Sequence, residues 1–200
     1  MSERYFTVMT ASRRAAHCAE LIIHLARLAQ SGETDPRLTP AQWTALRYFA
    51  RANRFSRTPS AFSSFHATTR GTASQTVKSL VALGLLEGQR SEADGRSTLF
   101  ELTATGHALL ERDPLCCLTA ALDGLAPETR AALLDGLRDV QTGLASARGT
   151  EHFGTCGDCC HREKSSGGGC YCASVLATVP EGEEGKLCIG FAPRGGSGPA

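Results

Sequence analysis

The sequence predicts a mainly α-helical protein with one small β-hairpin and a cysteine-rich segment near its C-terminus. Apolar residues recur at helical spacing through most of the first 150 positions. Two short extended runs, "LLEGQRS" and "STLFELT", flank the turn-forming stretch "EADG". Six of the nine cysteines lie between residues 153 and 191.

Length and composition suit one domain, or one domain with a small appendage. The chain has 200 residues, of which 42% are hydrophobic. The N-terminus lacks the apolar core and cleavage site of a signal peptide, and no run of about 18 apolar residues is present. We therefore expect a cytoplasmic protein with no membrane partner. Thiols stay reduced in that compartment, which favours a metal or redox role for the cysteines over disulfides.

The first half of the chain predicts four helices. Residues 10–30 are apolar over more than one face, so this helix needs more than one packing partner. In "LTPAQWTALRYFARA", Thr39 is the expected N-cap and Pro40 the first helical residue. We expect Ser60 to cap a short helix, "SAFSSFHA". The next helix, "GTASQTVKSLVALGLL", places Ala73, Val77, Leu80 and Val81 on one apolar stripe, and Gly84 ends it.

The second half begins with the hairpin, in which Asp94 and Gly95 supply the turn. A helix is predicted from Thr103, in "LTATGHALLER". Two further helices follow, in "LCCLTAALDGL" and "APETRAALLDGLRDVQTGLASAR". The second has an apolar side formed by Ala131, Leu133, Leu134, Leu137, Val140 and Leu144.

Three helices followed by a two-stranded hairpin is the layout of a winged helix-turn-helix. Residues 36–86 hold seven Arg and Lys side chains and no Asp or Glu, a local basic field that favours nucleic acid. The polar face of the third helix suits the major groove, and the basic hairpin suits phosphate or the minor groove. The candidate DNA-contacting residues are Ser60, Thr69, Arg70, Thr72, Ser74, Gln75, Lys78, Arg90 and Arg96.

The segments "LTPAQWTALRYFA", "TTRGTASQTVKSLVALGLL" and "RSEADGRSTLFELTATGHALLE" resemble the MarR family of bacterial transcriptional regulators. The resemblance covers about residues 10 to 145. It implies a recognition helix at about 70–83, a wing at about 88–100, and usually repression of nearby genes. It also implies that Asp94 supports the wing by pairing with a neighbouring arginine. Many members bind a small molecule, but no residue here identifies one.

The resemblance further implies a homodimer, and the two long apolar helices support this independently, because a small winged domain cannot cover them. A two-fold dimer predicts a palindromic double-stranded operator with half-sites about 10 base pairs apart, or a multiple of that. We expect a dimerisation helix in residues 1–35, the DNA-binding domain in 36–112 and further dimerisation helices in 113–149. The cysteine-rich segment then takes 150–192, and 193–200 form a disordered tail.

The cysteines predict a four-thiolate site. "CGDC" is a knuckle that turns Cys156 and Cys159 towards one ion, and Cys172 and Cys188 are the expected partners, with Cys160 and Cys170 as alternates. The uneven spacing favours an iron–sulfur cluster, zinc would take the same ligands, and metal-free redox thiols are the third possibility. We interpret His152 and His161 as surface residues. Cys18, Cys116 and Cys117 are predicted to be buried apolar residues.

These features predict a dimeric DNA-binding regulator whose cluster reports redox state, iron, oxygen or nitric oxide. The alternatives are the same regulator with structural zinc and a separate small-molecule or thiol signal, or an iron–sulfur electron carrier that uses the winged domain for protein contacts. No nucleophile–base pair stands out, so enzyme activity is not expected. The cysteine segment is expected to be an appendage to a DNA-binding domain that is complete without it.

Overall fold

The structure is a computed structural model that describes residues 12–30, 38–90, 97–164 and 170–194. Its elements are α1 (Arg13–Ala29), α2 (Pro40–Arg51), α3 (Pro59–Phe65), α4 (Arg70–Ala82), β1 (Leu86–Arg90), β2 (Thr98–Leu102), α5 (Ala104–Leu110), α6 (Cys116–Asp123), α7 (Pro127–Arg148), the 3-10 turn η1 (Cys156–Asp158), β3 (Arg162–Lys164), β4 (Cys170–Cys172) and β5 (Ala177–Val179). The predicted fold class, mainly α with a hairpin, is confirmed. Among the described residues, no helix is both long and apolar enough to cross a membrane.

The winged domain consists of α2 to α5 with β1 and β2. Thr39 caps α2 through a reciprocal capping box with Gln42, and Pro40 is the first helical residue, as predicted. Trp43, Leu46 and Phe49 are at most 2% exposed. Together with Phe62 of α3 they form a core that the aromatic rings of α2 and α3 dominate.

Two sequence predictions in this domain are wrong in detail. Thr58, and not Ser60, caps α3: the Thr58 side chain accepts the Ala61 N–H at 3.1 Å, and Pro59 takes the first helical position. Val81 is 40% exposed and does not share the buried stripe of Ala73, Val77 and Leu80. The contacts of α4 are with α2, α3 and β1, and these leave that side of its last turn open.

The hairpin packs closely against the end of α4. Gly84 has a φ of 67°, in the left-handed region that glycine commonly adopts just after a helix, and it ends α4 as predicted. The strands β1 and β2 pair antiparallel, with Leu86 opposite Leu102 and Arg90 opposite Thr98. A Cβ on Gly88 would lie 2.9 Å from Thr98 Cγ2, so only glycine allows this close cross-strand packing.

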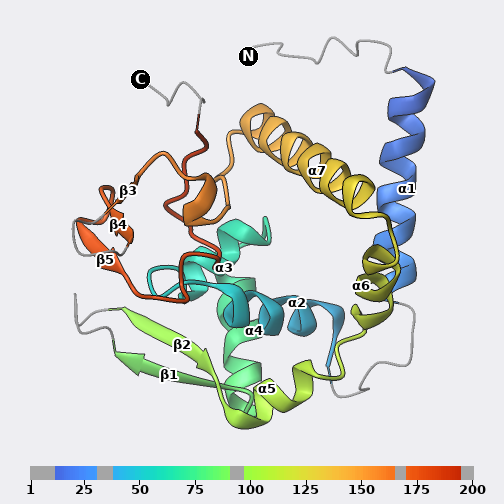
Figure 1. The fold of residues 1–200 in the computed structure, drawn as a ribbon. Coiled ribbons are helices and arrows are strands. Elements are labelled where there is room, and N and C mark those ends of the chain that lie inside the picture. Colours follow the sequence, from blue (N-terminus) through green and yellow to red (C-terminus); the bar gives the residue numbers. More distant parts are fainter. Residues whose placement is uncertain (1–11, 31–37, 91–96, 165–169, 195–200) are drawn as a thin grey trace, which may run out of the picture.

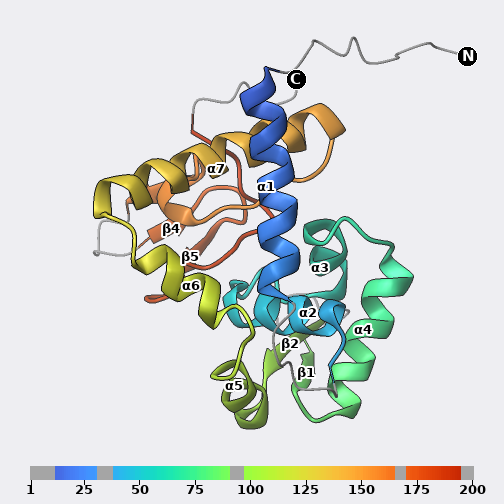
Figure 2. The ribbon, with the colours of Figure 1, turned by 90° about the vertical axis from the view of Figure 1, so that its right-hand side faces the viewer.

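The long helices α1 and α7 lie mostly away from the wing, at the other end of the molecule (Figures 1 and 2). Among the described residues, α1 buries none and α7 buries only Ala145. Their large apolar side chains are 38–58% exposed: Leu21, Ile22, Ile23, Leu25, Leu28, Leu133, Leu134, Leu137, Val140 and Leu144. Cys18, Cys116 and Cys117 are also exposed, so their predicted burial is wrong for a single chain, because no described residue covers them.

The C-terminal module, residues 150–164 and 170–194, follows α7, whose end is marked by Gly149 in the left-handed region at a φ of 61°. Its strands form a small antiparallel sheet in the order β3-β4-β5. Figure 1 shows the module beside α3 and above β2. Phe153 and Leu187 are only 8% exposed and belong to the same core as Trp43 and Phe62. The expectation of an appendage to an already complete domain is therefore wrong, since the module supplies part of the core.

Candidate functional site

The first candidate surface is the outer face of α4 with the adjoining hairpin. The Thr69 hydroxyl accepts the Thr72 N–H at 3.1 Å and lies 2.9 Å from the Thr72 hydroxyl, which fixes the start of the helix. Arg70, Thr72, Gln75 and Lys78 are exposed and Ser74 is half-buried. Ser79, on the same helix, is already engaged by Gln42 of α2. This helix thus presents a short polar surface with two positive charges.

The remaining predicted DNA contacts lie around this helix. Ser60 is exposed on α3, and Arg90 is exposed at the end of β1. Asp94 and Arg96, the predicted wing support and wing-tip contact, fall outside the described residues. Arg90 lies at the end of the hairpin where β1 and β2 are connected, and a basic side chain there can reach phosphate.

The basic field predicted from residues 36–86 does not act as one surface. Arg47 Nη1 pairs with Asp113 Oδ1 at 2.8 Å, and Arg57 Nη2 pairs with Glu183 Oε1 at 2.6 Å. These two guanidinium groups are held inside the fold by acids that lie far along the sequence. Arg70 and Lys78, in contrast, remain exposed on α4. Arg51 and Arg54 are exposed as well, so the positive charge available to a polyanion is divided between α4 and the region around the end of α2.

The second candidate site is a gathering of thiols in the C-terminal module. Cys156 begins η1, whose tight turn places the Cys159 N–H 3.3 Å from the Cys156 carbonyl oxygen. Cys170 and Cys172 occupy alternate positions of β4, so both side chains point to one face of the sheet. Cys188 forms an antiparallel bridge with Gly154, and its N–H donates to the Gly154 carbonyl at 2.9 Å.

Four of these thiols are buried: Cys156, Cys159, Cys170 and Cys188, while Cys172 is half-buried and Cys160 exposed. Burial raises the pKa of Cys156 to about 12, with further upward contributions from Cys170, Cys188, Cys159 and Cys172. Burial also raises the pKa of Cys188, and the nearby Cys172 and Cys159 add to the rise. Cys159 and Cys172 therefore lie close to both Cys156 and Cys188.

Three N–H donors lie beside this group of sulfurs. The Asn53 side chain and the Gly190 backbone N–H both lower the pKa of Cys188 by donating towards its sulfur. The Arg162 guanidinium, whose pKa is raised first by Cys170 and then by Glu184, donates towards the Cys170 sulfur. Yet Asn53 Nδ2 and Arg162 Nε have no partner at full hydrogen-bond geometry. A neutral thiol is a weak acceptor, so these donors are poorly satisfied unless the sulfur carries charge.

The thiols are neighbours and do not form a ready-made coordination sphere. Among the described residues, no group of three or more His, Cys, Asp or Glu side chains is arranged at metal-binding geometry. His152 lies 3.5 Å from Ser146 on the α7 side, and the backbone carbonyl of His161 accepts the Ala173 N–H. The residues that fit a thiophilic metal are thus cysteines, and the buried donors beside them are suited to thiolates.

Sequence reasoning missed three residues that connect this site to the rest of the fold. Asn53, Arg57 and Glu183 show no motif and no periodicity. Asn53 is 1% exposed, and the side chains of Arg57 and Glu183 are 14% and 12% exposed. The one available signal is weak: an Asn just after a helix is often a turn residue, which gives no hint of a nearby sulfur.

The helix-turn-helix core, the exposed polar face of α4 and the antiparallel hairpin define a winged helix-turn-helix DNA-binding protein. Residues 38–97 match the model of the MarR family. Over these residues the chain is thus similar to MarR-type transcriptional regulators, and its winged helix-turn-helix is a DNA-binding fold. No curated protein matches the chain.

Solved structures of bacterial regulators are similar to this chain. A mutant of MepR from a multidrug-resistant S. aureus clinical isolate has the same fold; it is 17% identical, with a TM-score of 0.51, over 64% of this chain and 96% of that one. FabT of Streptococcus pneumoniae in complex with DNA is 23% identical, with a TM-score of 0.45, over 67% and 93% of the two chains. BpsR of Bordetella bronchiseptica, whose DNA binding is regulated by 6-hydroxynicotinic acid, is 25% identical with a TM-score of 0.43, over 60% and 98%.

Proposed function

We propose that this protein is a homodimeric repressor whose C-terminal module holds an iron–sulfur cluster, and that the state of this cluster controls DNA binding. The ligands are Cys156, Cys159, Cys172 and Cys188. The observation that carries the proposal is Asn53 Nδ2, a buried donor beside the sulfur of the proposed ligand Cys188 that has no acceptor at full hydrogen-bond geometry. Thiolates bound to a metal accept such bonds strongly.

The choice of ligands rests on proximity. Cys156 and Cys188 lie near each other, and Cys159 and Cys172 lie near both. Cys160 is exposed, and its N–H is bonded to the Ala192 carbonyl at 2.8 Å. Cys170 acts on the pKa of Cys156, but Cys172 acts on both Cys156 and Cys188, so we propose Cys172 as the ligand and Cys170 as a fifth thiol next to the site.

A cluster would supply one-electron chemistry and sensitivity to oxygen, nitric oxide and iron supply. The protein contributes the four sulfurs, the donors that stabilise their charge, and partial shielding from solvent. The proposal assumes a reducing cytoplasm, in which these thiols are free to bind metal.

The homodimer is supported by the apolar faces of α1 and α7. Their leucine, isoleucine and valine side chains are exposed in one chain, and large exposed apolar surfaces mark sites of association. A second copy of this chain is the occupant we propose, because the two faces belong to long helices that lie away from α4 and the wing (Figure 2). Two-fold symmetry then places two copies of α4 on a palindromic operator.

The decisive experiment is anaerobic purification of the full chain, followed by its visible spectrum and its content of iron, acid-labile sulfide and zinc. We expect brown protein containing both iron and sulfide. The Cys172→Ser variant should lose them, whereas Cys160→Ser should keep them. Colourless protein with one zinc per chain would support the second candidate, a structural zinc site, which the tight Cys156–Cys159 knuckle also fits. Protein with neither metal would overturn both.

A further inference from the structure

Residues 52–58 join the C-terminal module to the DNA-binding machinery, and we name them the bridging segment. The segment begins with a parallel bridge between Ala52 and Leu187, the residue before Cys188. The Asn53 N–H donates to the Leu187 carbonyl at 2.9 Å, and the Leu187 N–H donates to the Arg51 carbonyl at 2.7 Å. On the other side of Cys188, the Ile189 N–H donates to Ser56 Oγ at 2.9 Å. The chain around Cys188 is therefore held to the bridging segment on both sides.

The Asn53 side chain is fixed in an orientation that faces the thiols. Its Oδ1 accepts the Ser56 hydroxyl at 2.7 Å and the Phe55 N–H at 3.2 Å. With the oxygen committed to these two donors, Nδ2 is directed to the other side, where Cys188 lies. Ser56 in turn accepts from Ile189, and its carbonyl accepts the Tyr48 hydroxyl at 2.7 Å. A buried polar network thus begins at the Cys188 sulfur and ends in the core of α2.

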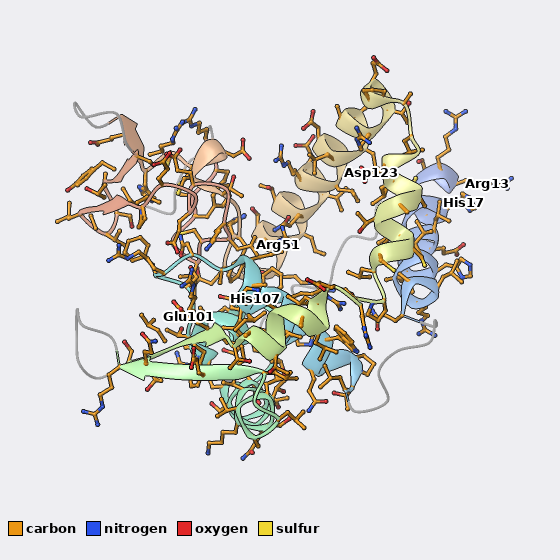
Figure 3. All side chains as sticks on the ribbon, turned by 60° about the horizontal axis from the view of Figure 1, so that its bottom comes forward. Arg13, His17, Arg51, Glu101, His107 and Asp123 are labelled. Atoms are coloured by element: carbon orange, nitrogen blue, oxygen red, sulfur yellow. The ribbon has the colours of Figure 1, made fainter. Side chains whose placement is uncertain are left out.

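Arg57 carries the connection to the wing. Its Nη2 pairs with Glu183 of the module at 2.6 Å, and its Nη1 pairs with Glu101 of β2. Its Nε donates to the Ala52 carbonyl at 3.1 Å, and its own carbonyl accepts the Phe100 N–H of β2 at 2.8 Å. Glu183 also accepts the Arg54 N–H through its second oxygen, at 3.0 Å. Figure 3 shows Glu101 on β2, beneath the module.

The Arg57–Glu183 contact is shielded, whereas the Glu101 side chain on the wing is 47% exposed, so the backbone bond from Phe100 to Arg57 is the firmer link to β2. The Arg57 and Glu183 side chains are 14% and 12% exposed, so water screens this pair less than it screens a surface ion pair. The segment also leads directly into α3, because the Thr58 N–H is bonded to the Ser56 carbonyl and Thr58 caps that helix. A shift of the bridging segment therefore displaces the wing and α3 together.

We infer that the bridging segment transmits the occupancy of the cysteine site to the wing, with Asn53 sensing the Cys188 sulfur and Arg57 linking Glu183 to Glu101. The inference rests on the proposed function, since it needs a site that gains and loses its metal. A metal-bound thiolate accepts the Asn53 N–H firmly, whereas a neutral thiol does not. Loading thus fixes the segment and the wing, and the preordered wing binds the operator more tightly than the metal-free form.

The test measures operator affinity for loaded and unloaded protein at one salt concentration. The probe is a fluorescent duplex selected with the wild-type protein from a random pool, and binding is followed by anisotropy. Loading uses ferrous iron and sulfide, or zinc(II) if the purified protein contains zinc, and metal content is determined on the same samples. We expect loaded wild-type protein to bind about fivefold more tightly or better, within the usual range of coupling between two sites.

Two conservative variants interrupt the link. Glu183→Gln removes the negative charge of the bridge at nearly constant size, and Arg57→Lys keeps the positive charge but removes the fork that joins Glu183 to Glu101. We expect both to retain their metal while the ratio of loaded to unloaded affinity falls towards one. The control is Asp123→Asn, which alters an exposed ion pair with Arg130 between α6 and α7, and it should keep the wild-type ratio.

The outcomes separate the two proposals. If the variants load normally and keep the full affinity ratio, the link through Arg57 is wrong. If wild-type protein loads but shows a ratio of one, nothing is transmitted and the inference is overturned while the metal site stands. Failure of wild-type protein to take up iron or zinc overturns the proposed function itself. Thermal melts followed by circular dichroism show which variants fold, and either one alone suffices for the test.

Discussion

The ring of Phe153, just beyond the end of α7, packs edge-on against the ring of Phe65 in α3, with centroids 5.1 Å apart and an interplanar angle of 81°. Phe153 is 8% exposed, so this contact closes one side of the winged core. The next residue, Gly154, has no room for a side chain, because a Cβ there would lie 2.6 Å from the Phe191 ring. Two stretches of the C-terminal module thus pack together where it meets α3.

Replacement of Phe153 by alanine should destabilise the DNA-binding domain itself. We expect the free energy of unfolding of metal-free protein to fall by about 3 kcal/mol, because a large aromatic side chain leaves a cavity in the core. Urea unfolding followed by the fluorescence of Trp43, which lies in the same core, measures this change. The control is Leu176→Ala, at a side chain that is 75% exposed, which should change stability little. Equal stability of the two variants would mean that the module folds independently.

On the exposed face of α4, we expect Arg70 to contact phosphate and Gln75 to contact base edges. Arg70→Ala should weaken binding to all duplexes, and the slope of log affinity against log salt should become less steep by about one phosphate contact. Gln75→Ala should instead alter the preferred sequence and leave the salt slope nearly unchanged. Titrations of both variants at several salt concentrations, with operator and scrambled duplexes, distinguish the two effects. Identical behaviour of the two variants would contradict the placement of α4 in the major groove.

The apolar face of α7 should be needed for self-association. Leu137 is 42% exposed in one chain, and a charge at this position would have to be buried in a dimer. We therefore expect Leu137→Glu to be monomeric in sedimentation velocity at concentrations where the wild type is a dimer. Leu176→Glu, the same substitution on an exposed turn of the module, is the matched control and should remain dimeric. A dimeric Leu137→Glu variant would move the interface elsewhere.

The sequence predicted the helices well, because their signals are local. Thr39 with Pro40, Gly84 and Thr103 each mark a helix end through chemistry that acts within a few residues, and the structure confirms all three. The misplaced cap of α3 shows the limit of this reasoning. Thr58 and Ser60 are both good caps, and only Pro59 at the first helical position decides between them.

Contacts between distant segments could not be predicted in the same way. Arg57 appeared to be part of a basic field because its acids, Glu101 and Glu183, lie 44 and 126 positions away. Asn53 shows the same limit, since only the fold brings Leu187 and Cys188 beside it. The thiols themselves were predictable, because their density and spacing are visible in one short stretch.

Metal uptake should release protons and weaken as pH falls. Cys156 has a pKa of about 12, raised from 9.0 chiefly by burial, so its thiol is protonated in the metal-free protein throughout the neutral range. The metal binds the thiolate, and each bound sulfur must first give up its proton. The pKa of Cys156 is higher in the folded protein than in the unfolded chain. The protonated thiol therefore also stabilises the metal-free fold below about pH 9, and this contribution is lost as pH rises towards 12.

Zinc(II) is a convenient probe of the same thiols. We therefore expect its apparent affinity to fall about tenfold or more for each unit that pH drops between 8 and 6. Calorimetric titrations of reduced protein with zinc(II), in buffers of different ionisation enthalpy, count the protons released. At least one proton should be released per zinc at every pH, from Cys156 alone. The Cys160→Ser variant should release the same number, since Cys160 is exposed and apart from the proposed ligands. An affinity independent of pH would show that zinc binds elsewhere, to groups already deprotonated.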